Sequence, residues 1–320
     1  MCAVLFLCTA HFSGGVILNN DSFICSLCPR SCGALRDERG GEGFCGLGSL
    51  PRISRAAPHM WEEPCISGSR GSGTIFFSGC TLSCVYCQNY CISAGRQGIT
   101  VSVSRLAGCY KKLEEMGVHN INLVTPTPYI DSIIRSFEIY RPSVPIVYNT
   151  GGYEKPETLR RLEGIVDIYL PDVKYSDDAA AVRYSSAPDY FRTAMRAVEE
   201  MVRQTGSPVF DEEGMMKRGT IVRNLILPGM TGNSIRILRA LDEAFGDRIL
   251  VSLMCQYIPE GRASDYPEIN RRITKREYEK VLSVLEETGL DGFVQELSSA
   301  KKEYIPDFST DALSQFLSSI

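Results

Sequence analysis

Apolar residues recur along the chain in two alternating patterns from about residue 74 onward. Short runs rich in β-branched and aromatic residues are typical of buried strands, and longer stretches with apolar residues every three or four positions are typical of helices. The runs that predict strands are Thr74–Phe77, Asn120–Val124, Ile146–Tyr148, Val166–Leu170, Thr220–Leu227 and Ile249–Leu253. The stretches that predict helices are Leu106–Leu113, Tyr129–Tyr140, Pro156–Leu162, Phe191–Gln204, Ser234–Phe245 and Tyr278–Leu285.

This alternation predicts an α/β fold. Six strand-helix units joined by crossovers favour parallel strands, and six units indicate a partial (β/α)6 TIM-like barrel. Residues before 71 are rich in Cys, Gly and Pro and show no sustained apolar period. We therefore expect a Cys-rich N-terminal segment over residues 1–70, the barrel over 71–300 and a helical C-terminal tail over 301–320. Active sites of such barrels lie at the carboxyl ends of the strands.

Charge and hydropathy exclude two classes of partner. The 320 residues carry 34 basic and 38 acidic side chains, a net charge of -4, so no overall positive field attracts nucleic acid or an anionic membrane. The early apolar run Ala3–Ala10 is shorter than the roughly 20 residues of a membrane-spanning helix, and it has no basic leader typical of a signal peptide. We expect a cytoplasmic protein that contacts neither nucleic acid nor membrane.

Cysteine usage indicates metal binding. Of the 13 cysteines, all but Cys255 precede residue 110, and several are separated by short intervals. In a long chain, such clusters are more typical of metal ligands than of disulfides. Only three histidines are present, which favours iron-sulfur chemistry over mixed Cys/His zinc sites. Five cysteines outside the clusters are interpreted as small apolar residues: Cys2, Cys8, Cys65, Cys109 and Cys255.

The central cluster, Cys80-x3-Cys84-x2-Cys87, directly follows the first predicted strand. Three thiolates can hold three irons of a 4Fe-4S cube and leave the fourth iron open for a small molecule. The alternative is that Cys91 supplies a fourth ligand and closes a structural zinc or ferredoxin-type site. A closed electron-transfer site needs no barrel behind its ligand loop, so the context favours the open cluster.

Four further cysteines lie upstream in a compact segment with few other means of stability, so a bound metal would fold it. Their spacing is C-x2-C-x3-C-x12-C, and they are Cys25, Cys28, Cys32 and Cys45. Four sulfurs suit either tetrahedral zinc or a second iron-sulfur cluster. We favour the auxiliary iron-sulfur cluster.

The run His59–Pro64 contains the only tryptophan, Trp61, and the adjacent acids Glu62 and Glu63. We expect Trp61 to pack this segment onto the barrel and the glutamates to cap a helix or to face water. The alternative is that the run lines the mouth of a substrate site.

The three-cysteine spacing, with Tyr86 before the last cysteine and a strand before the first, resembles the signature of the radical S-adenosylmethionine (SAM) superfamily. The run Gly79–Ser93, with Cys87-Gln88-Asn89, resembles uncharacterised relatives of pyruvate formate-lyase-activating enzyme, and the similarity extends from Cys25 onward. The resemblance implies an anaerobic oxidoreductase with a 4Fe-4S cluster and SAM. Such an enzyme cleaves SAM reductively to a 5′-deoxyadenosyl radical, which abstracts hydrogen from the substrate, and it needs no acid-base triad.

The resemblance also assigns cofactor contacts to the strand ends. Lys174 and Arg223 would bind the cofactor carboxylate, and Tyr86 would contact the adenine region. The Gly-Gly-Glu element of the activases is missing near Thr127, where backbone carbonyls would accept hydrogen bonds from the cofactor amine. Asn149 replaces an aspartate of the activases, which argues against their bound monovalent cation. The full set of predicted contacts is Tyr86, Thr127, Asn149, Thr150, Gly152, Asp172, Lys174, Arg223 and Gln256.

By the same resemblance, the reaction would install a glycyl radical on a partner enzyme or otherwise modify a partner protein. A low-potential donor such as flavodoxin or ferredoxin would supply the electron. One alternative is radical modification of a small metabolite or peptide. A second alternative is a non-catalytic iron-sulfur electron carrier or zinc-binding module.

Overall fold

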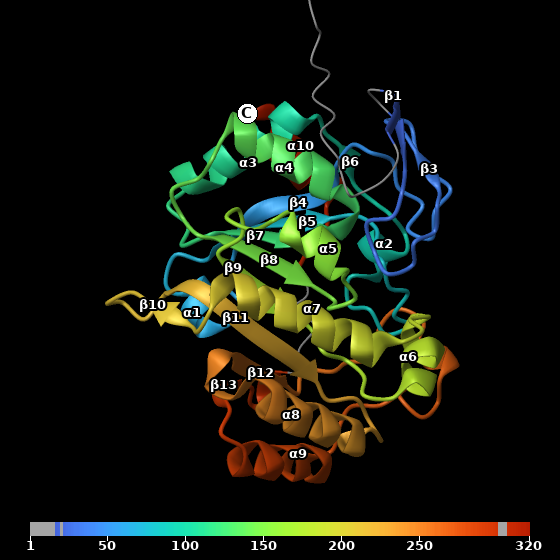
Figure 1. Cartoon of the computed structure of the whole chain (residues 1–320), viewed down its shortest axis with the longest axis vertical. Coiled ribbons are helices and arrows are strands. Elements are labelled where there is room, and N and C mark those ends of the chain that lie inside the picture. Colours follow the sequence, from blue (N-terminus) through green and yellow to red (C-terminus); the bar gives the residue numbers. More distant parts are fainter. Residues whose placement is uncertain (1–16, 20–21, 300–305) are drawn as a thin grey trace, which may run out of the picture.

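Seven parallel strands form the centre of the computed structural model (Figure 1), which describes residues 17–19, 22–299 and 306–320. The sheet order is β13-β12-β11-β9-β8-β7-β5-β4-β6, and the end strands β13 and β6 are not paired with each other in this order. The parallel strands are β5 (Ser72–Phe77), β7 (Ile121–Val124), β8 (Ile146–Thr150), β9 (Ile168–Pro171), β11 (Met216–Leu225), β12 (Leu250–Met254) and β13 (Asp291–Val294). The predicted α/β partial barrel is confirmed.

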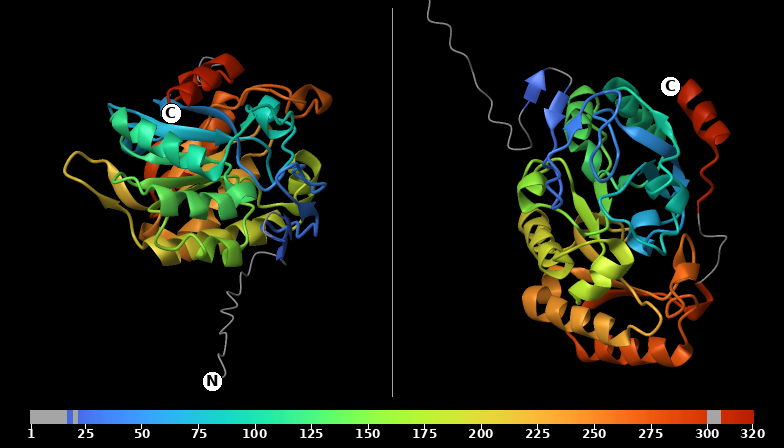
Figure 2. Two further views of the ribbon diagram at one scale, coloured as in Figure 1. Left: turned by 90° about the horizontal axis from the view of Figure 1, so that it is seen from above. Right: turned by 90° about the vertical axis from the view of Figure 1, so that its right-hand side faces the viewer.

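Helices cover the outer face of the curled sheet (Figures 1 and 2). Ser102 starts the first long helix by accepting a hydrogen bond from the backbone N–H of Arg105, and Thr274 and Glu277 form a capping box at the start of the last barrel helix. The long helices are α3 (Val103–Glu115), α4 (Ile130–Ile139), α7 (Tyr190–Thr205), α8 (Thr231–Phe245) and α9 (Lys275–Glu287). Shorter helices are α1 (Pro64–Ser67), α2 (Tyr90–Ser93), α5 (Pro156–Arg160), α6 (Asp178–Ser185) and α10 (Thr310–Ser318).

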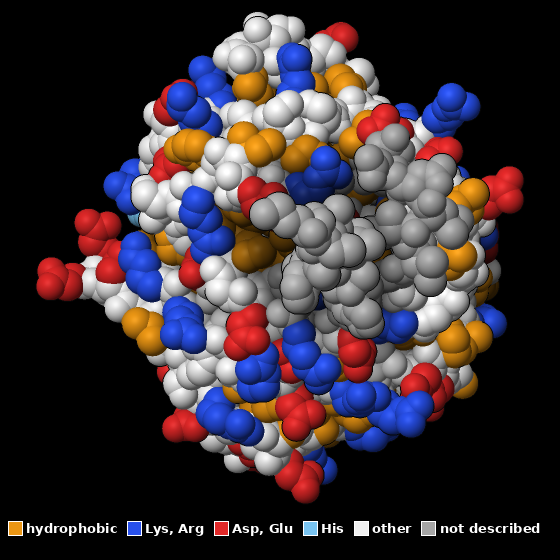
Figure 3. Space-filling model, turned by 45° about the horizontal axis from the view of Figure 1, so that its top comes forward, with side chains coloured by type: hydrophobic (Ala, Val, Ile, Leu, Met, Phe, Trp, Pro, Cys, Tyr) orange, Lys and Arg blue, Asp and Glu red, His pale blue; other side chains and the backbone are white. Residues whose placement is uncertain are grey.

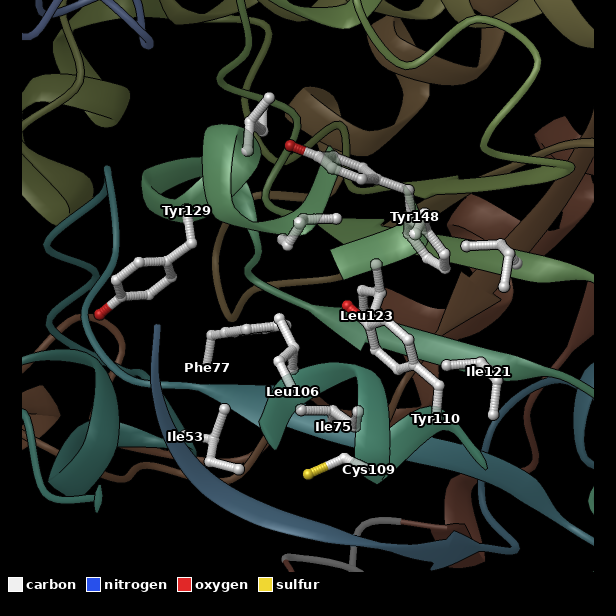
Figure 4. Packing of buried hydrophobic residues seen from close by; sticks show 14 of the residues in the cluster. Ile53, Ile75, Phe77, Leu106, Cys109, Tyr110, Ile121, Leu123, Tyr129 and Tyr148 are labelled. Atoms are coloured by element: carbon white, nitrogen blue, oxygen red, sulfur yellow. The ribbon is translucent and has the colours of Figure 1, made fainter. Parts of the chain in front are cut away.

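Outward-facing strand residues pack against these helices. Ile75 and Phe77 of β5 lie beside Leu106 and Tyr110 of α3 in one buried cluster (Figure 4). Cys109 is fully buried in the same cluster. Cys65 and Cys255 are buried as well, so their interpretation as small apolar residues is confirmed. Cys2, Cys8 and the run Ala3–Ala10 lie outside the described residues.

The sheet differs from the sequence expectation at its two ends. β4 (Arg52–His59) pairs antiparallel with β5, and β6 (Ile99–Thr100) pairs with β4. The predicted boundary between residues 70 and 71 therefore falls in the connection between two strands that pair with each other, β4 and β5. At the other end, β13 adds a seventh parallel strand beyond the six predicted. α10 lies within the predicted helical tail and packs on β4 (Figure 2).

The four-cysteine segment, residues 22–49, lies against the barrel beside α5 (Figures 1 and 2). It contains β2 (Ser22–Ile24) and β3 (Leu35–Arg36), which form a small sheet with β1 (Ile17–Asn19). Lys155 donates to the Ser26 carbonyl at 3.0 Å, and Thr158 donates to the Leu27 carbonyl at 2.8 Å. These bonds fix the segment at the carboxyl edge of the sheet.

Basic and acidic side chains are interspersed over the lower part of the face shown in Figure 3, in keeping with the small net charge. β10 (Val209–Phe210) extends from the sheet as an antiparallel partner of β11. Within the part of the chain that the structure describes, no helix combines the length and apolar character needed to cross a bilayer.

Candidate active site

The three-cysteine loop, residues 78–89, turns sharply after β5. Gly79 has a φ of 78°, and a Cβ at this position would overlap the side chain of Leu47, so glycine is required here. The loop is then held by backbone hydrogen bonds from Ser83 N–H to the Ser185 carbonyl (3.1 Å) and from Val85 N–H to the Tyr184 carbonyl (2.8 Å). The end of α6 thus positions the ligand loop over the carboxyl edge of the sheet.

The three thiols of this loop are partly buried and hydrogen-bonded. Ser185 donates to Cys84 Sγ at 3.0 Å, Ser93 donates to Cys87 Sγ at 3.3 Å, and the loop backbone donates to Cys80 Sγ. Burial raises the pKa of Cys87 to about 11, and it raises the pKa of the other two thiols as well. Metal binding requires thiolates, so a bound cluster would displace these protons. As a donor set, the three sulfurs fit an iron-sulfur cluster.

Cys91 lies on α2, outside this group of thiols. Its side chain packs against an apolar cluster formed by Phe76, Ile92 and Val124. Within residues 17–19, 22–299 and 306–320, no three His, Cys, Asp or Glu side chains are arranged as ligands of a single ion. The thiols of Cys84 and Cys87 both lie within electrostatic range of Cys80, whereas Cys91 lies in an apolar contact.

Beneath the loop, a charged layer crosses the barrel interior, with Arg223 of β11 at its centre. Arg223 donates to Asp172 Oδ1 at 2.9 Å, to Asn149 Oδ1 at 2.6 Å and to Glu62 Oε2 at 3.3 Å. Burial alone would lower the pKa of Arg223, but the surrounding carboxylates raise it. The layer comprises Glu62, Glu63, Asn122, Asn149, Asp172, Lys174, Arg223 and Ser252.

Lys174 links this layer to the thiols. Its ammonium group lies 2.5 Å from Asp172 Oδ2. Burial raises the pKa of the Asp172 carboxyl, but Arg223 and Lys174 outweigh this effect, so the net shift is downward. Burial likewise opposes the charge of Lys174, while Asp172 and the Cys84 thiol raise its pKa. A fixed cation beside the three-cysteine loop is suited to bind a carboxylate ligand.

The placement of the run His59–Pro64 corrects the sequence expectation. Trp61 is 60% exposed, whereas Glu62 and Glu63 enter the barrel interior. Glu62 accepts a hydrogen bond from Asn122 at 3.0 Å, and burial raises the pKa of both glutamates against the opposing effect of Arg223. The glutamates face inward because their charge partner, Arg223 of β11, lies in the barrel interior. This partner is distant in the sequence, so no local pattern revealed it.

This layer is suited to a cationic ligand. Three carboxyl groups face only two cationic side chains, and within the described residues Glu63 Oε2 and Asn122 Oδ1 are buried without a hydrogen-bond partner. Buried polar atoms are normally satisfied, so these two acceptors indicate a missing donor. The ammonium group of SAM supplies such donors, and its sulfonium adds positive charge. The residues present therefore fit SAM.

Two of the predicted contacts converge on an acid that the sequence analysis missed. Thr127 and Thr150 both donate to Glu154 Oε1, the former at 2.6 Å. Burial raises the pKa of Glu154 to about 7. Gly152 has a φ of 79°, and a Cβ there would overlap the Asp172 carbonyl, so this glycine lets β8 and β9 approach each other. Glu154 is polar, fully buried and close to three predicted residues, but its sequence neighbourhood contains no motif.

Tyr86 and Gln256 are placed with other partners. The Tyr86 hydroxyl lies 2.7 Å from that of Tyr175, and its ring contacts Tyr257 edge to face at 5.8 Å. Gln256 accepts a hydrogen bond from Gln295 at 3.2 Å. Neither side chain hydrogen-bonds to the charged layer within the described residues.

A cavity of about 560 Å³ lies at the opposite end of the barrel, and its lining includes Cys65, His119, Met215 and Phe293. None of the predicted cofactor contacts lines it. The candidate active site is the charged layer and the loop above it, because these residues occupy the carboxyl ends of the strands.

Comparisons with known proteins concern the family of this chain. Residues 74–221, which include the three-cysteine loop, match the Radical SAM superfamily. The chain is 30% identical over 275 residues to "Uncharacterized protein MJ0674" of Methanocaldococcus jannaschii, covering 83% of this chain and 75% of that protein. Methylornithine synthase (PylB) aligns with a TM-score of 0.48 at 14% identity, over 77% of this chain and 80% of its own.

Streptococcus suis SuiB bound to precursor peptide SuiA aligns with a TM-score of 0.46 at 16% identity, over 73% of this chain. The alignment covers 51% of SuiB, so the chain spans about half the length of that protein. The family match implies a 4Fe-4S cluster and SAM as cofactors and supports an enzymatic function. On the family match and the relationship to the archaeal protein, the chain belongs to the radical SAM superfamily.

Proposed function

We propose that this chain is a hydrogen-abstracting radical SAM enzyme that acts on a partner protein, with activation of a glycyl-radical enzyme as the specific reaction. The observation that carries the proposal is the three-thiol loop above an interior layer with an excess of acids. The resemblance of Gly79–Ser93 to the activases supports the choice of substrate. Radical modification of a small metabolite or peptide is the alternative substrate class.

In this proposal Cys80, Cys84 and Cys87 hold the 4Fe-4S cluster. When bound, the cluster and SAM supply a 5′-deoxyadenosyl radical that abstracts hydrogen. Lys174, which lies beside the thiols and pairs with Asp172, would bind the SAM carboxylate. Arg223 orients Asp172 and Asn149 and holds the charge of the layer in place.

The charged layer would supply the hydrogen-bond acceptors for the amine of SAM in this proposal. Glu63 Oε2 and Asn122 Oδ1 are the unpartnered acceptors, and backbone carbonyls near Thr127 add to them. Glu154 binds the hydroxyls of Thr127 and Thr150 and thereby fixes the ends of β7 and β8. Tyr86 of the three-cysteine loop and Gln256, which follows β12, would complete the adenosine side, with Tyr86 oriented by Tyr175.

A second metal is part of the proposal. Cys25, Cys28, Cys32 and Cys45 would bind an auxiliary iron-sulfur cluster or zinc, and a flavodoxin or ferredoxin would supply low-potential electrons. The proximity of the four-cysteine segment to the ligand loop supports this part, because Arg30 from that segment donates to the Thr81 carbonyl at 2.5 Å.

The substrate class can be tested with pyruvate formate-lyase as a probe protein. The anaerobically reconstituted enzyme is mixed with SAM, a reductant and the probe, and protein-based radicals are recorded by electron paramagnetic resonance (EPR). We expect a radical signal on the probe that depends on SAM and is absent with Cys84→Ala. The matched control, Cys91→Ala, should retain the signal.

SAM cleavage without any radical on the probe would overturn activation of this glycyl-radical enzyme. The second substrate class is then tested with deuterated cell extracts separated by size. Deuterium transfer into 5′-deoxyadenosine from the small-molecule fraction alone would replace the protein substrate with a metabolite or peptide.

A further inference from the structure

The four upstream cysteines converge in the folded segment. Cys25 exchanges backbone hydrogen bonds with the turn after Cys32, donating to the Ala34 carbonyl at 2.9 Å and accepting from Gly33 N–H at 3.1 Å. Cys28 lies within electrostatic range of Cys25 and Cys45, and Cys45 lies within range of Cys25 and Cys32. These pairs link all four thiols within the folded segment. Among the described residues no three of them are arranged around a single ion, an arrangement that a 4Fe-4S cube does not need because each thiolate binds a different iron.

This group extends from the protein surface toward the barrel. Cys32 is exposed, Cys28 and Cys45 are partly buried, and Cys25 is buried. On the inner side, Cys28 lies within electrostatic range of Glu154, at the edge of the candidate active site. A redox centre held here would be accessible to a donor protein on one side and close to the three-cysteine loop on the other.

Arg30 connects the two cysteine groups. It lies between Cys28 and Cys32 in the sequence, and its guanidinium stacks 3.3 Å above the ring of Phe44. The side chain donates to the carbonyl of Thr81, which follows Cys80, at 2.5 Å. It also donates at 2.7 Å to the carbonyl of Ser186, the residue after the Ser185 that binds Cys84.

The connection is short in terms of bonds. From Cys28 the covalent chain passes through Pro29 to the Arg30 side chain, one hydrogen bond leads to Thr81, and the backbone continues to Cys80. The thiols of both Cys28 and Cys80 lie within electrostatic range of the same guanidinium. Arg30 thus contacts the surroundings of both groups.

We propose that Cys25, Cys28, Cys32 and Cys45 bind a redox-active 4Fe-4S cluster that passes single electrons to the cluster at the three-cysteine loop, with Arg30 as the connecting residue. This inference rests on the proposed function, because it assigns the entry route of the electron used there. One electron from a low-potential flavodoxin or ferredoxin reduces the outer cluster, which returns to its oxidised state as the inner cluster is reduced. No bond forms or breaks in the transfer. Zinc at the outer site would block it, because Zn²⁺ has no redox chemistry.

The first test is metal content and spectroscopy of the full chain. Anaerobic reconstitution should give about eight irons per chain, two 4Fe-4S clusters, and Cys32→Ser should lower this to about four. Reduced wild-type protein should show two EPR species, of which the Cys32→Ser variant keeps the one that responds to added SAM. About four irons or stoichiometric zinc in the wild-type protein would overturn the assignment.

The second test measures electron transfer directly. Reduced flavodoxin is mixed with the oxidised holoenzyme, and the SAM-responsive EPR signal is followed by rapid freezing. We expect Arg30→Gln to slow its appearance about tenfold, equivalent to about 1.4 kcal/mol of barrier, at unchanged iron content. Arg141→Gln is the matched control. Arg141 also donates to a backbone carbonyl, that of Gly164, but it lies in the loop between α4 and β8, which leads into the amino end of β8 and is therefore away from both cysteine groups.

Failure of the relay and failure of the proposed function give different results. An unchanged rate in both Arg30→Gln and Cys32→Ser would overturn the relay even if SAM is cleaved. Normal transfer between two clusters without SAM cleavage in the wild-type enzyme would instead overturn the proposed function and leave the relay supported.

Discussion

Two layers of the barrel interior differ completely in character although the same strands build them. The apolar layer consists of Val147, Leu170, Ile221 and Leu250, and α1 closes it with Cys65 and Ile66. The next inward-facing positions toward the carboxyl ends are Asn149, Asp172, Arg223 and Ser252. Because side chains alternate along a strand, two positions separate neighbours on one face. Two residues further along each strand, the interior therefore changes from a packed apolar core to a polar and charged surface.

This difference separates stability from chemistry along each strand. The apolar layer is held by burial, so its side chains act through packing. In the charged layer, Arg223 and Lys174 form ion pairs with the acids around them. Two buried acceptors of the layer have no hydrogen-bond donor among the described residues. Substitutions in the two layers should therefore have separable effects.

The largest effect on stability is expected for Arg223→Gln. Without the guanidinium, Glu62 and Asp172 lose a buried charge partner, which costs about 3–5 kcal/mol near pH 8. The loss should shrink toward pH 5, because the pKa values of Glu62 and Glu63 are already raised by burial and these acids then take up protons. Urea unfolding at both pH values measures this. A loss no larger than that of Arg141→Gln would contradict the account of the layer.

Ile221→Ala probes the apolar layer one step below Arg223. It removes fully buried apolar volume, so we expect about 2–5 kcal/mol lower stability without the pH dependence of the Arg223 variant. At temperatures where the variant remains folded, the KM for SAM should be unchanged. A raised KM would show that the two layers are not separable.

Glu154 tests the role of charge compensation. Asp172 has two cationic partners that hold its pKa low, whereas burial raises the pKa of Glu154 from 4.5 to about 7. Between pH 4.5 and about 7, Glu154 keeps a proton in the folded chain that it has released in the unfolded chain. The free energy of unfolding therefore falls as pH rises through this range, by about 3 kcal/mol in total. Glu154→Gln should remove this slope in urea unfolding of the metal-free chain at pH 5 and pH 7.5. Equal slopes for both proteins would exclude this role.

The smallest effect is expected for Lys174→Met, which keeps most of the aliphatic stem. Asp172 retains Arg223 as a partner, so stability should change little. Loss of the cation beside the thiols should raise the KM for SAM about tenfold, equivalent to about 1.4 kcal/mol. Initial rates of SAM cleavage measure this. An unchanged KM would remove Lys174 from the predicted contacts.

The sequence predicted the parts of the fold that local patterns encode. All six predicted strands and the long helices between them are present, because their buried faces have clear periodicity. β4 was missed because its sequence, RISRAAPH, has no regular alternation of apolar and polar residues. This segment becomes a strand through its pairing with β5 rather than through local propensity. β13 is short and contains a glycine, which weakens a strand pattern.

For the candidate site, the sequence predicted positions at strand ends but not the partners they would find. Asn149, Asp172 and Arg223 were predicted one by one from the resemblance, and the structure joins them by hydrogen bonds. Glu62 was expected at the surface, because its partner Arg223 is 161 residues away and no local pattern reveals a pairing of that range. Glu154 was missed for a different reason, because its sequence neighbourhood contains no motif even though its partner Thr150 is only four residues away.

The most direct test of the central claim is reductive cleavage of SAM by the anaerobically reconstituted chain, measured as 5′-deoxyadenosine formed per enzyme. The account predicts product with the wild-type enzyme and with Cys91→Ala, and none with Cys84→Ala. Product from Cys84→Ala, or loss of both cluster and product in Cys91→Ala, would contradict a three-thiol cluster with an open iron.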